Sequence, residues 1–127
     1  FDGAQKPAPK KQIKFEREIQ SVFYNNKYVG ISYSDTKKEN SWHIKVYDMN
    51  GKTVMENDTE IAYNRIELLD NNEICVRDDY NCELFTIHSI RKFRYTFDRQ
   101  LYNVLSGSDG QNYTLVLNGE IEEVRLQ

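Results

Sequence analysis

A repeated pattern of short strands and turns is the feature of this sequence that most constrains its fold. The turn Asn25-Asn26 recurs as Asn71-Asn72, 46 residues further along, and Asp109-Gly110 takes the same place in a third, shorter unit. A later turn follows in each unit, at Asn50-Gly51, His88-Ser89 and Asn118-Gly119. A period of roughly 40 to 50 residues is typical of the four-stranded blade of a β-propeller.

Between the turns, apolar and polar residues alternate, which favours strands with one buried face. The clearest case is 42–47, where Trp42, Ile44 and Val46 would share one face. Further strands are predicted at 12–15, 19–24, 28–33 and 65–69, and a polar loop at 35–41. The best helical candidate, 59–69, lacks a steady 3.6-residue period, so its second part is interpreted as the strand 65–69.

The pattern predicts an all-β fold, a partial β-propeller of the WD40 or PQQ-like kind with about three four-stranded antiparallel meanders. The units would span about 1–16 (partial), 18–58, 60–98 and 101–127 of one domain, 1–127. One meander cannot bury its apolar face alone, so neighbouring units should stack. Because three units do not close a ring and the chain begins at Phe1, we expect the C-terminal fragment of a longer propeller, or completion by another copy. The segment QIKFE, 12–16, would be the outer strand of a preceding blade or would pair with the unfinished last unit.

The later turns differ in how well they suit a tight hairpin. Asn50-Gly51 favours a two-residue type I′ turn, which requires positive φ at both central residues. His88-Ser89 fits this geometry poorly, so the turn of the second unit is predicted to be longer or bulged.

Composition excludes several classes of function. The formal net charge of −3 gives no general attraction to nucleic acid or to anionic membranes. No apolar run approaches the ~18 residues of a membrane span, and no charged-then-apolar leader is visible. Cys75 and Cys82 flank the segment VRDDYN and could face each other across a hairpin. A disulfide between them stays open as an alternative, but two buried free thiols are the expectation.

The residues that could carry chemistry are few. His43 and His88 are the only histidines, and both are expected on the solvated surface rather than in a metal or nucleophile–base site. Asp78 and Asp79, with Asp70 nearby, form the densest carboxylate group, but they lack the spacing and Gly of a calcium loop. The Gly-rich run 106–112 lacks the Lys and helix of a phosphate loop and is expected to be a plain loop. No residue is therefore assigned a catalytic, cofactor-binding or metal role, and no cofactor is expected.

The segment IRKFRYTF interleaves basic and aromatic residues, a pattern that can bind single-stranded nucleic acid. In a strand, however, Phe93, Tyr95 and Phe97 would share one face and Lys92 and Arg94 the other. The aromatic residues are then predicted in the core between units and the cations in solvent, so no nucleic-acid partner is expected.

Several stretches together resemble the C-terminal part of a bacterial domain-of-unknown-function family. These are FDGAQK, EIQSVFYNNKYVGISY, IKVYDMNGKTV, ELFTIHSIRKFRYTFD and NGEIEEVRL. The resemblance implies a propeller-like repeat domain behind an N-terminal membrane anchor. It therefore implies an extracytoplasmic location on the cell surface of a Gram-positive bacterium, tethered through a segment absent from this chain. It brings no catalytic residues with it.

Two classes of function stay open. The first is a non-enzymatic binding or scaffolding module that holds an unknown protein or glycan through its blade faces or loops. The second is part of a propeller enzyme whose active-site residues lie mostly in other blades. The fragment is also expected to self-associate through exposed blade faces.

Overall fold

The computed structural model describes residues 13–15, 18–34, 41–107 and 109–126, and it contains eleven strands and no helix within them. The all-β prediction is confirmed. Sheet 1 consists of β1 (Ser21–Tyr24), β2 (Tyr28–Ser34), β3 (Trp42–Asp48) and β4 (Thr53–Thr59). Sheet 2 consists of β5 (Arg65–Leu68), β6 (Ile74–Arg77), β7 (Asn81–Phe85) and β8 (Arg91–Thr96). Sheet 3 consists of β9 (Leu101–Ser106), β10 (Asn112–Leu117) and β11 (Glu120–Arg125).

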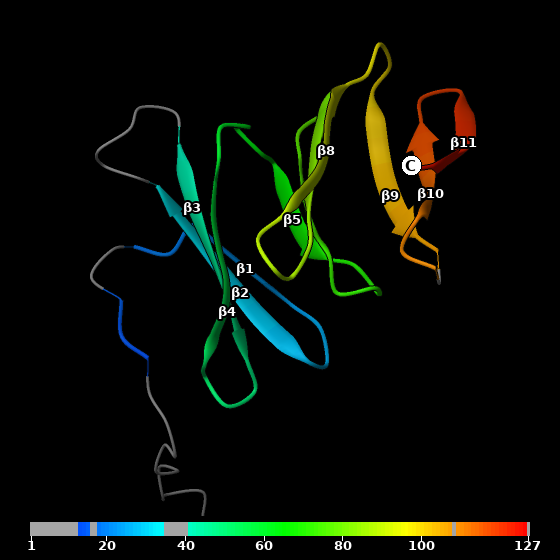
Figure 1. The fold of residues 1–127 in the computed structure, drawn as a ribbon. Coiled ribbons are helices and arrows are strands. Elements are labelled where there is room, and N and C mark those ends of the chain that lie inside the picture. The colour runs from blue at the N-terminus through cyan, green and yellow to red at the C-terminus, as the bar shows by residue number, and fades with distance from the viewer. Residues whose placement is uncertain (1–12, 16–17, 35–40, 108, 127) are drawn as a thin grey trace, which may run out of the picture.

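Each sheet is an antiparallel meander in which consecutive strands pair. The three sheets stand in a row, with sheet 1 at one end and sheet 3 at the other (Figure 1). The edge strands β1 and β5 of neighbouring sheets contact each other. This arrangement is compatible with a partial β-propeller.

An apolar layer between sheets 1 and 2 forms the first half of the core. The alternation predicted for 42–47 is confirmed, because Ile44 and Val46 are fully buried in this layer. The other buried members are Phe23, Met55, Ile61, Ile66, Ile74, Val76 and Phe85. Because each strand sends alternate side chains to opposite faces, β6 and β7 contribute to this layer and also to the next one.

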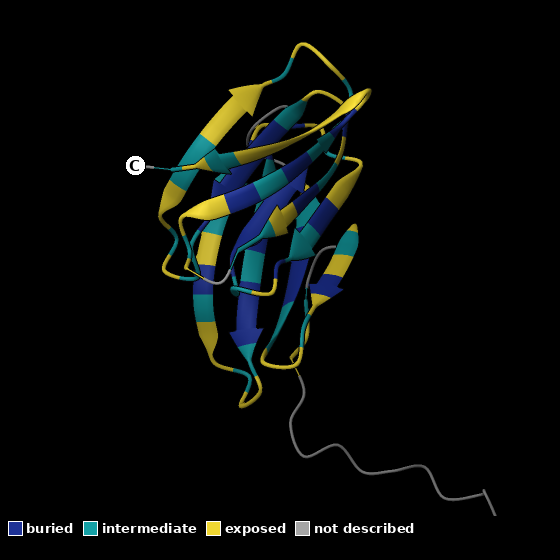
Figure 2. Cartoon of the chain, turned by 90° about the vertical axis from the view of Figure 1, so that its right-hand side faces the viewer, coloured by how far each residue is buried: buried dark blue, intermediate teal, exposed yellow. Residues whose placement is uncertain are grey.

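A second layer joins sheets 2 and 3. Its buried members are Leu69, Cys75, Cys82, Leu84, Leu101, Val104, Tyr113, Leu115 and Leu117. Figure 2 shows the buried residues of the strands in dark blue. Cys75 and Cys82 lie on the neighbouring strands β6 and β7, with 3.6 Å between their Sγ atoms, and both are buried free thiols as predicted. The hydrogen bond with Cys82, together with burial, raises the pKa of the Cys75 thiol well above its ordinary value.

The hairpin turns share one geometry that the sequence did not reveal. Gly51, Asn72 and Ser89 each have positive φ, at 79°, 67° and 69°. Asn50 does not, so the predicted type I′ turn at Asn50-Gly51 is wrong. The backbone N–H of Gly51 bonds to Asp48 and that of Ser89 bonds to Thr86, as in loops that end with one left-handed residue. The turn at His88-Ser89 thus has the same geometry as that at Asn50-Gly51, and the strand pairing next to each turn contains a bulge. The bulged alternative predicted for the second unit is confirmed, and it also applies to the first.

Two predicted segments need separate mention. The strand predicted at 12–15 is not formed at residues 13–15, and Gln12 lies outside the described residues. Residues 13–15 instead lie against sheet 1, where the Phe15 and Tyr47 rings are 6.1 Å apart between centroids. Residues 35–40 of the predicted loop also lie outside the described part of the chain, whereas the strand predicted at 65–69 is confirmed as β5.

Candidate binding surface

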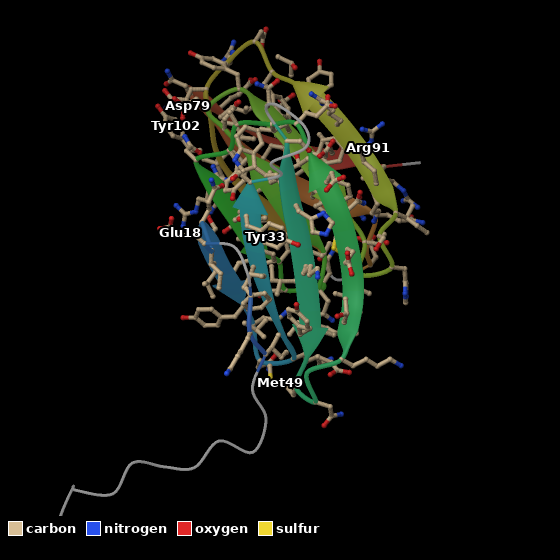
Figure 3. The ribbon with its side chains drawn as sticks, turned by 90° about the vertical axis from the view of Figure 1, so that its left-hand side faces the viewer. Glu18, Tyr33, Met49, Asp79, Arg91 and Tyr102 are labelled. Atoms are coloured by element: carbon tan, nitrogen blue, oxygen red, sulfur yellow. The ribbon has the colours of Figure 1, made fainter. Side chains whose placement is uncertain are left out.

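The outward face of sheet 1, which points away from sheet 2, carries an apolar recess of about 350 Å³. It forms there because Val29 and Tyr47 are paired across β2 and β3, opposite in direction to the buried Ile44 and Val46. Its lining residues are Ile13, Phe15, Val29, Ile31, Tyr47, Asp48, Met49 and Gly51. Met49 lies at the rim and is 63% exposed (Figure 3). A recess of this kind suits an apolar side chain of a partner.

A polar group lies on the same sheet, at the other end of β3 from the recess residues Tyr47 and Asp48. The His43 ring lies between two carboxylates, with Nδ1 2.6 Å from Asp58 and Nε2 2.9 Å from Glu56. The ring of Tyr33 lies 5.3 Å from it, across the β2–β3 pair. The sequence suggested a simply solvated His43. The structure instead holds its ring in a defined orientation. His88 is exposed in the β7–β8 turn, so the fold does not bring the two histidines together.

A buried polar cluster of Glu73, Lys92 and Tyr113 links sheets 2 and 3. Lys92 Nζ donates hydrogen bonds of 2.8 Å to both Glu73 and the Tyr113 hydroxyl, and a third to the carbonyl of Gly110. The Tyr113 hydroxyl in turn donates to Glu73. The side chains of Lys92 and Glu73 are 21% and 10% exposed, and Tyr113 is 2% exposed. All three ammonium protons thus have acceptors.

These three side chains, which we call the lock, hold sheets 2 and 3 together through their hydrogen bonds. Burial by itself would lower the pKa of Lys92, but the hydrogen bonds to Glu73 and Tyr113 outweigh burial and raise it. Burial and the Glu73 hydrogen bond raise the pKa of the Tyr113 hydroxyl. Lysines that act as bases or nucleophiles need a lowered pKa, so Lys92 stays a cation and pairs with the Glu73 carboxylate.

Lys92 was predicted in solvent, and this prediction is wrong because of a β-bulge. Leu84 pairs with Phe93 but Phe85 pairs with Arg91, so Lys92 is the extra residue in β8. The bulge turns its side chain toward sheet 3, which strict alternation would not allow. Phe93 and Phe97 pack on the second apolar layer as predicted, whereas Tyr95 is 57% exposed. The sequence analysis allowed for a bulge at the turn of this hairpin but did not place Lys92 in it.

Of the three carboxylates that are close in the sequence, Asp70 is separated from Asp78 and Asp79 in the fold. Asp78 lies in the β6–β7 turn and accepts hydrogen bonds from the backbone N–H groups of Tyr80 and Asn81. Asp79 accepts one from the Asn64 amide. Asp70 lies in the β5–β6 turn, at the opposite end of the same sheet. Among the described residues, no group of three or more His, Cys, Asp or Glu side chains could hold a metal ion.

The sequence matches the model of one protein family over residues 1–126, the family described as "Family of unknown function (DUF5711)". The chain belongs to this family. The match spans all three sheets, so the row of meanders is part of the DUF5711 domain. No curated protein matches the sequence. The described part of this DUF5711 chain has no helical segment with the length and hydropathy that a membrane span requires.

A second recess in the DUF5711 domain, of about 550 Å³, lies between β8 and β11. Phe93, Phe97 and Leu115 supply apolar walls, and β11 supplies Val124 and the carboxylates of Glu120 and Glu122. Sheets 1 and 2 have a fourth strand at their outer edge, but within the described residues sheet 3 ends at β11. The recess therefore lies beside a strand edge without a partner strand.

Proposed function

We propose that this DUF5711 chain is a non-enzymatic binding or scaffolding module that holds a protein or glycan through its outward sheet faces. We further propose that it is the extracytoplasmic part of a membrane-tethered bacterial protein, as its family resemblance implies. The recess on the outward face of sheet 1 carries the proposal. It has an apolar lining, and the same sheet carries the polar side chains Tyr33, His43 and Glu56 further along its strands, so that the sheet offers both apolar and polar contacts to a partner.

The state of the reactive side chains favours binding over catalysis. The ammonium group of Lys92 donates hydrogen bonds to three acceptors, and each ring nitrogen of His43 is hydrogen-bonded to a carboxylate. A general base or nucleophile must instead present a free atom to the substrate. These side chains hold strands and sheets together, and the exposed apolar surface is left for contact with a partner.

A photocrosslinking experiment tests the binding surface and the location together. Met49→Cys places an exposed thiol at the recess rim, while Cys75 and Cys82 are buried. A membrane-impermeant photoactivatable maleimide is added to intact bacteria that express the parent protein. We expect labelling of Met49→Cys from outside the cell and, after illumination, one adduct of defined mass.

The matched control is Asp79→Cys, which is exposed at the opposite end of the sheets (Figure 3). It should be labelled equally well from outside but should give no defined adduct. Labelling of neither variant until the cells are lysed would contradict the extracytoplasmic location. Adducts of equal yield from both positions would contradict a binding site on sheet 1.

A further inference from the structure

The edge of β11 is the place where sheet 3 is one strand shorter than its neighbours. Sheets 1 and 2 each have a fourth strand, β4 or β8, and within the described residues no strand pairs with the outer edge of β11. The backbone N–H of Leu126 donates to Gln111, on the β10 side of the pair. Because backbone groups alternate along an antiparallel pair, those of Ile121, Glu123 and Arg125 point to the free edge. An edge of this kind can bind an extended segment through main-chain hydrogen bonds.

The recess of about 550 Å³ beside this edge has an aromatic wall that sheet 3 leaves uncovered. Phe93 and Tyr95 pair with Leu84 and Cys82 across β7 and β8, so their side chains point toward sheet 3. Phe93 packs on the second apolar layer, but Tyr95 is 57% exposed. Side chains of β11 line the other side of the recess. The inward side chains of a fourth strand in sheet 3 would therefore enter the recess and cover Tyr95.

The charge of β11 specifies which strand fits. Glu122 and Val124 line the recess, whereas Ile121 and Glu123 lie on the opposite face of the sheet. Both glutamates are exposed, and in the described part of the chain neither forms an ion pair. A complementary strand has basic residues opposite the two glutamates and apolar residues opposite Ile121 and Val124.

The carboxylates also select against other strands, as charged side chains on sheet edges commonly do. Antiparallel pairing with β11 of a second copy, centred on Glu122 or Glu123, would place like charges opposite one another. Of the described residues that line the recess, Arg99 is the one cation, and it lies 3.8 Å from Glu120. Glu122 thus keeps its charge available for a basic residue of a partner.

We propose that the edge of β11 binds an extended segment of a partner protein as the fourth strand of sheet 3. The segment carries two consecutive basic residues, opposite Glu123 and Glu122, between apolar residues opposite Val124 and Ile121. Its backbone completes the hydrogen bonds of the free edge, and its inward side chains fill the recess beside Tyr95. This surface is separate from the recess on sheet 1, so the inference goes beyond the proposed function and does not depend on it.

The synthetic peptide LTVKKIT is the probe. In antiparallel pairing with β11, its lysines lie opposite Glu123 and Glu122 and its valine lies opposite Val124. Amide hydrogen exchange of the full chain, measured by NMR, shows where it binds. At saturating peptide, exchange at Ile121, Glu123 and Arg125 should slow by about tenfold or more, because these N–H groups gain main-chain acceptors. The charge-reversed peptide LTVEEIT should leave their exchange unchanged.

Variants of exposed residues separate strand addition from a general attraction of charges. The double variant E122K/E123K should bind LTVKKIT about tenfold more weakly and should bind LTVEEIT instead, because the charges are exchanged and not lost. Tyr95→Ala should also weaken the binding of LTVKKIT, since it removes part of the recess wall. The matched control is Tyr24→Ala on sheet 1, where Tyr24 is 74% exposed, and it should not change the affinity.

Three results would overturn the inference. The first is equal affinity of the two peptides for the natural chain, and the second is unchanged exchange at Ile121, Glu123 and Arg125 in excess LTVKKIT. The third is protection of these amides without peptide, which would show that the chain itself or a second copy fills the edge. None of these results affects the Met49→Cys adduct, so the failure of this inference and the failure of the proposed function are distinguishable.

Discussion

Lys92→Met should lower the free energy of unfolding by about 3 kcal/mol, because it leaves the buried Glu73 carboxylate without its cation. Removal of one partner from a buried ion pair typically costs about 3–5 kcal/mol. We expect the lower end of this range because the Lys92 side chain is still 21% exposed to solvent. Urea denaturation followed by far-UV circular dichroism, which reports on all three sheets, measures the change.

Two further variants test whether the loss of stability comes from the lock or from the removal of a charge in general. Glu73→Gln together with Lys92→Met should recover most of the loss, since no uncompensated charge then remains buried. Arg94→Met, on the same strand, breaks an exposed contact with Glu60 at 3.9 Å and should change stability by less than about 0.5 kcal/mol. Equal effects of Lys92→Met and Arg94→Met would contradict the assignment of a lock between sheets 2 and 3.

Gly30→Ala should destabilise the chain by about 2 to 3 kcal/mol, the upper part of the range for overpacking a core. Gly30 pairs with Phe23 across β1 and β2, and the Phe23 ring lies over the glycine. A Cβ on residue 30 would overlap three atoms of that ring. Because Phe23 is buried in the layer between sheets 1 and 2, the ring cannot move without disturbing that layer. The unfolding midpoint in urea measures the loss.

The double variant F23L/G30A tests whether this overlap is the cause. In the Phe23→Leu background, Gly30→Ala should cost clearly less than in the natural chain, because the ring that it meets is gone. Gly110→Ala is the comparison for a different mechanism, since its Cβ would meet no atom within 4 Å but its φ is 71°. A cost of Gly30→Ala that is unchanged by Phe23→Leu would place the strain elsewhere.

The sequence predicted the strands well where burial alternates strictly. The segment 42–47 became β3 because Ile44 and Val46 face a packed layer while His43 and Lys45 face outward. The type of turn was harder to predict, because Gly51 suits both a type I′ turn and the observed loop with one left-handed residue. Ser89 adopts positive φ in the same loop, which its side chain does not favour.

The polar contacts could not be predicted because they depend on packing between sheets. Ser89 accepts hydrogen bonds from Glu56 and Asn57 of sheet 1, and the Asn25 amide donates to Asn72 of sheet 2. Asn72 and Ser89, the two non-glycine residues with positive φ in the described part of the chain, thus both join sheets 1 and 2. In the same way, the hydrogen bonds of Lys92 could not be predicted, because its partners Glu73 and Tyr113 come from another turn and from another sheet.

Nuclear Overhauser contacts between methyl groups test the row of three sheets most directly. The fold predicts cross-peaks within each of the two layers and none that join sheet 1 to sheet 3 within one copy. The first set should link Ile44, Val46 and Met55 with Ile74 and Val76, and the second should link Leu84 with Val104 and Leu115. Observation of both sets would support the row. Intramolecular cross-peaks between Ile44 or Val46 and Leu115 would contradict it, because those side chains belong to different layers.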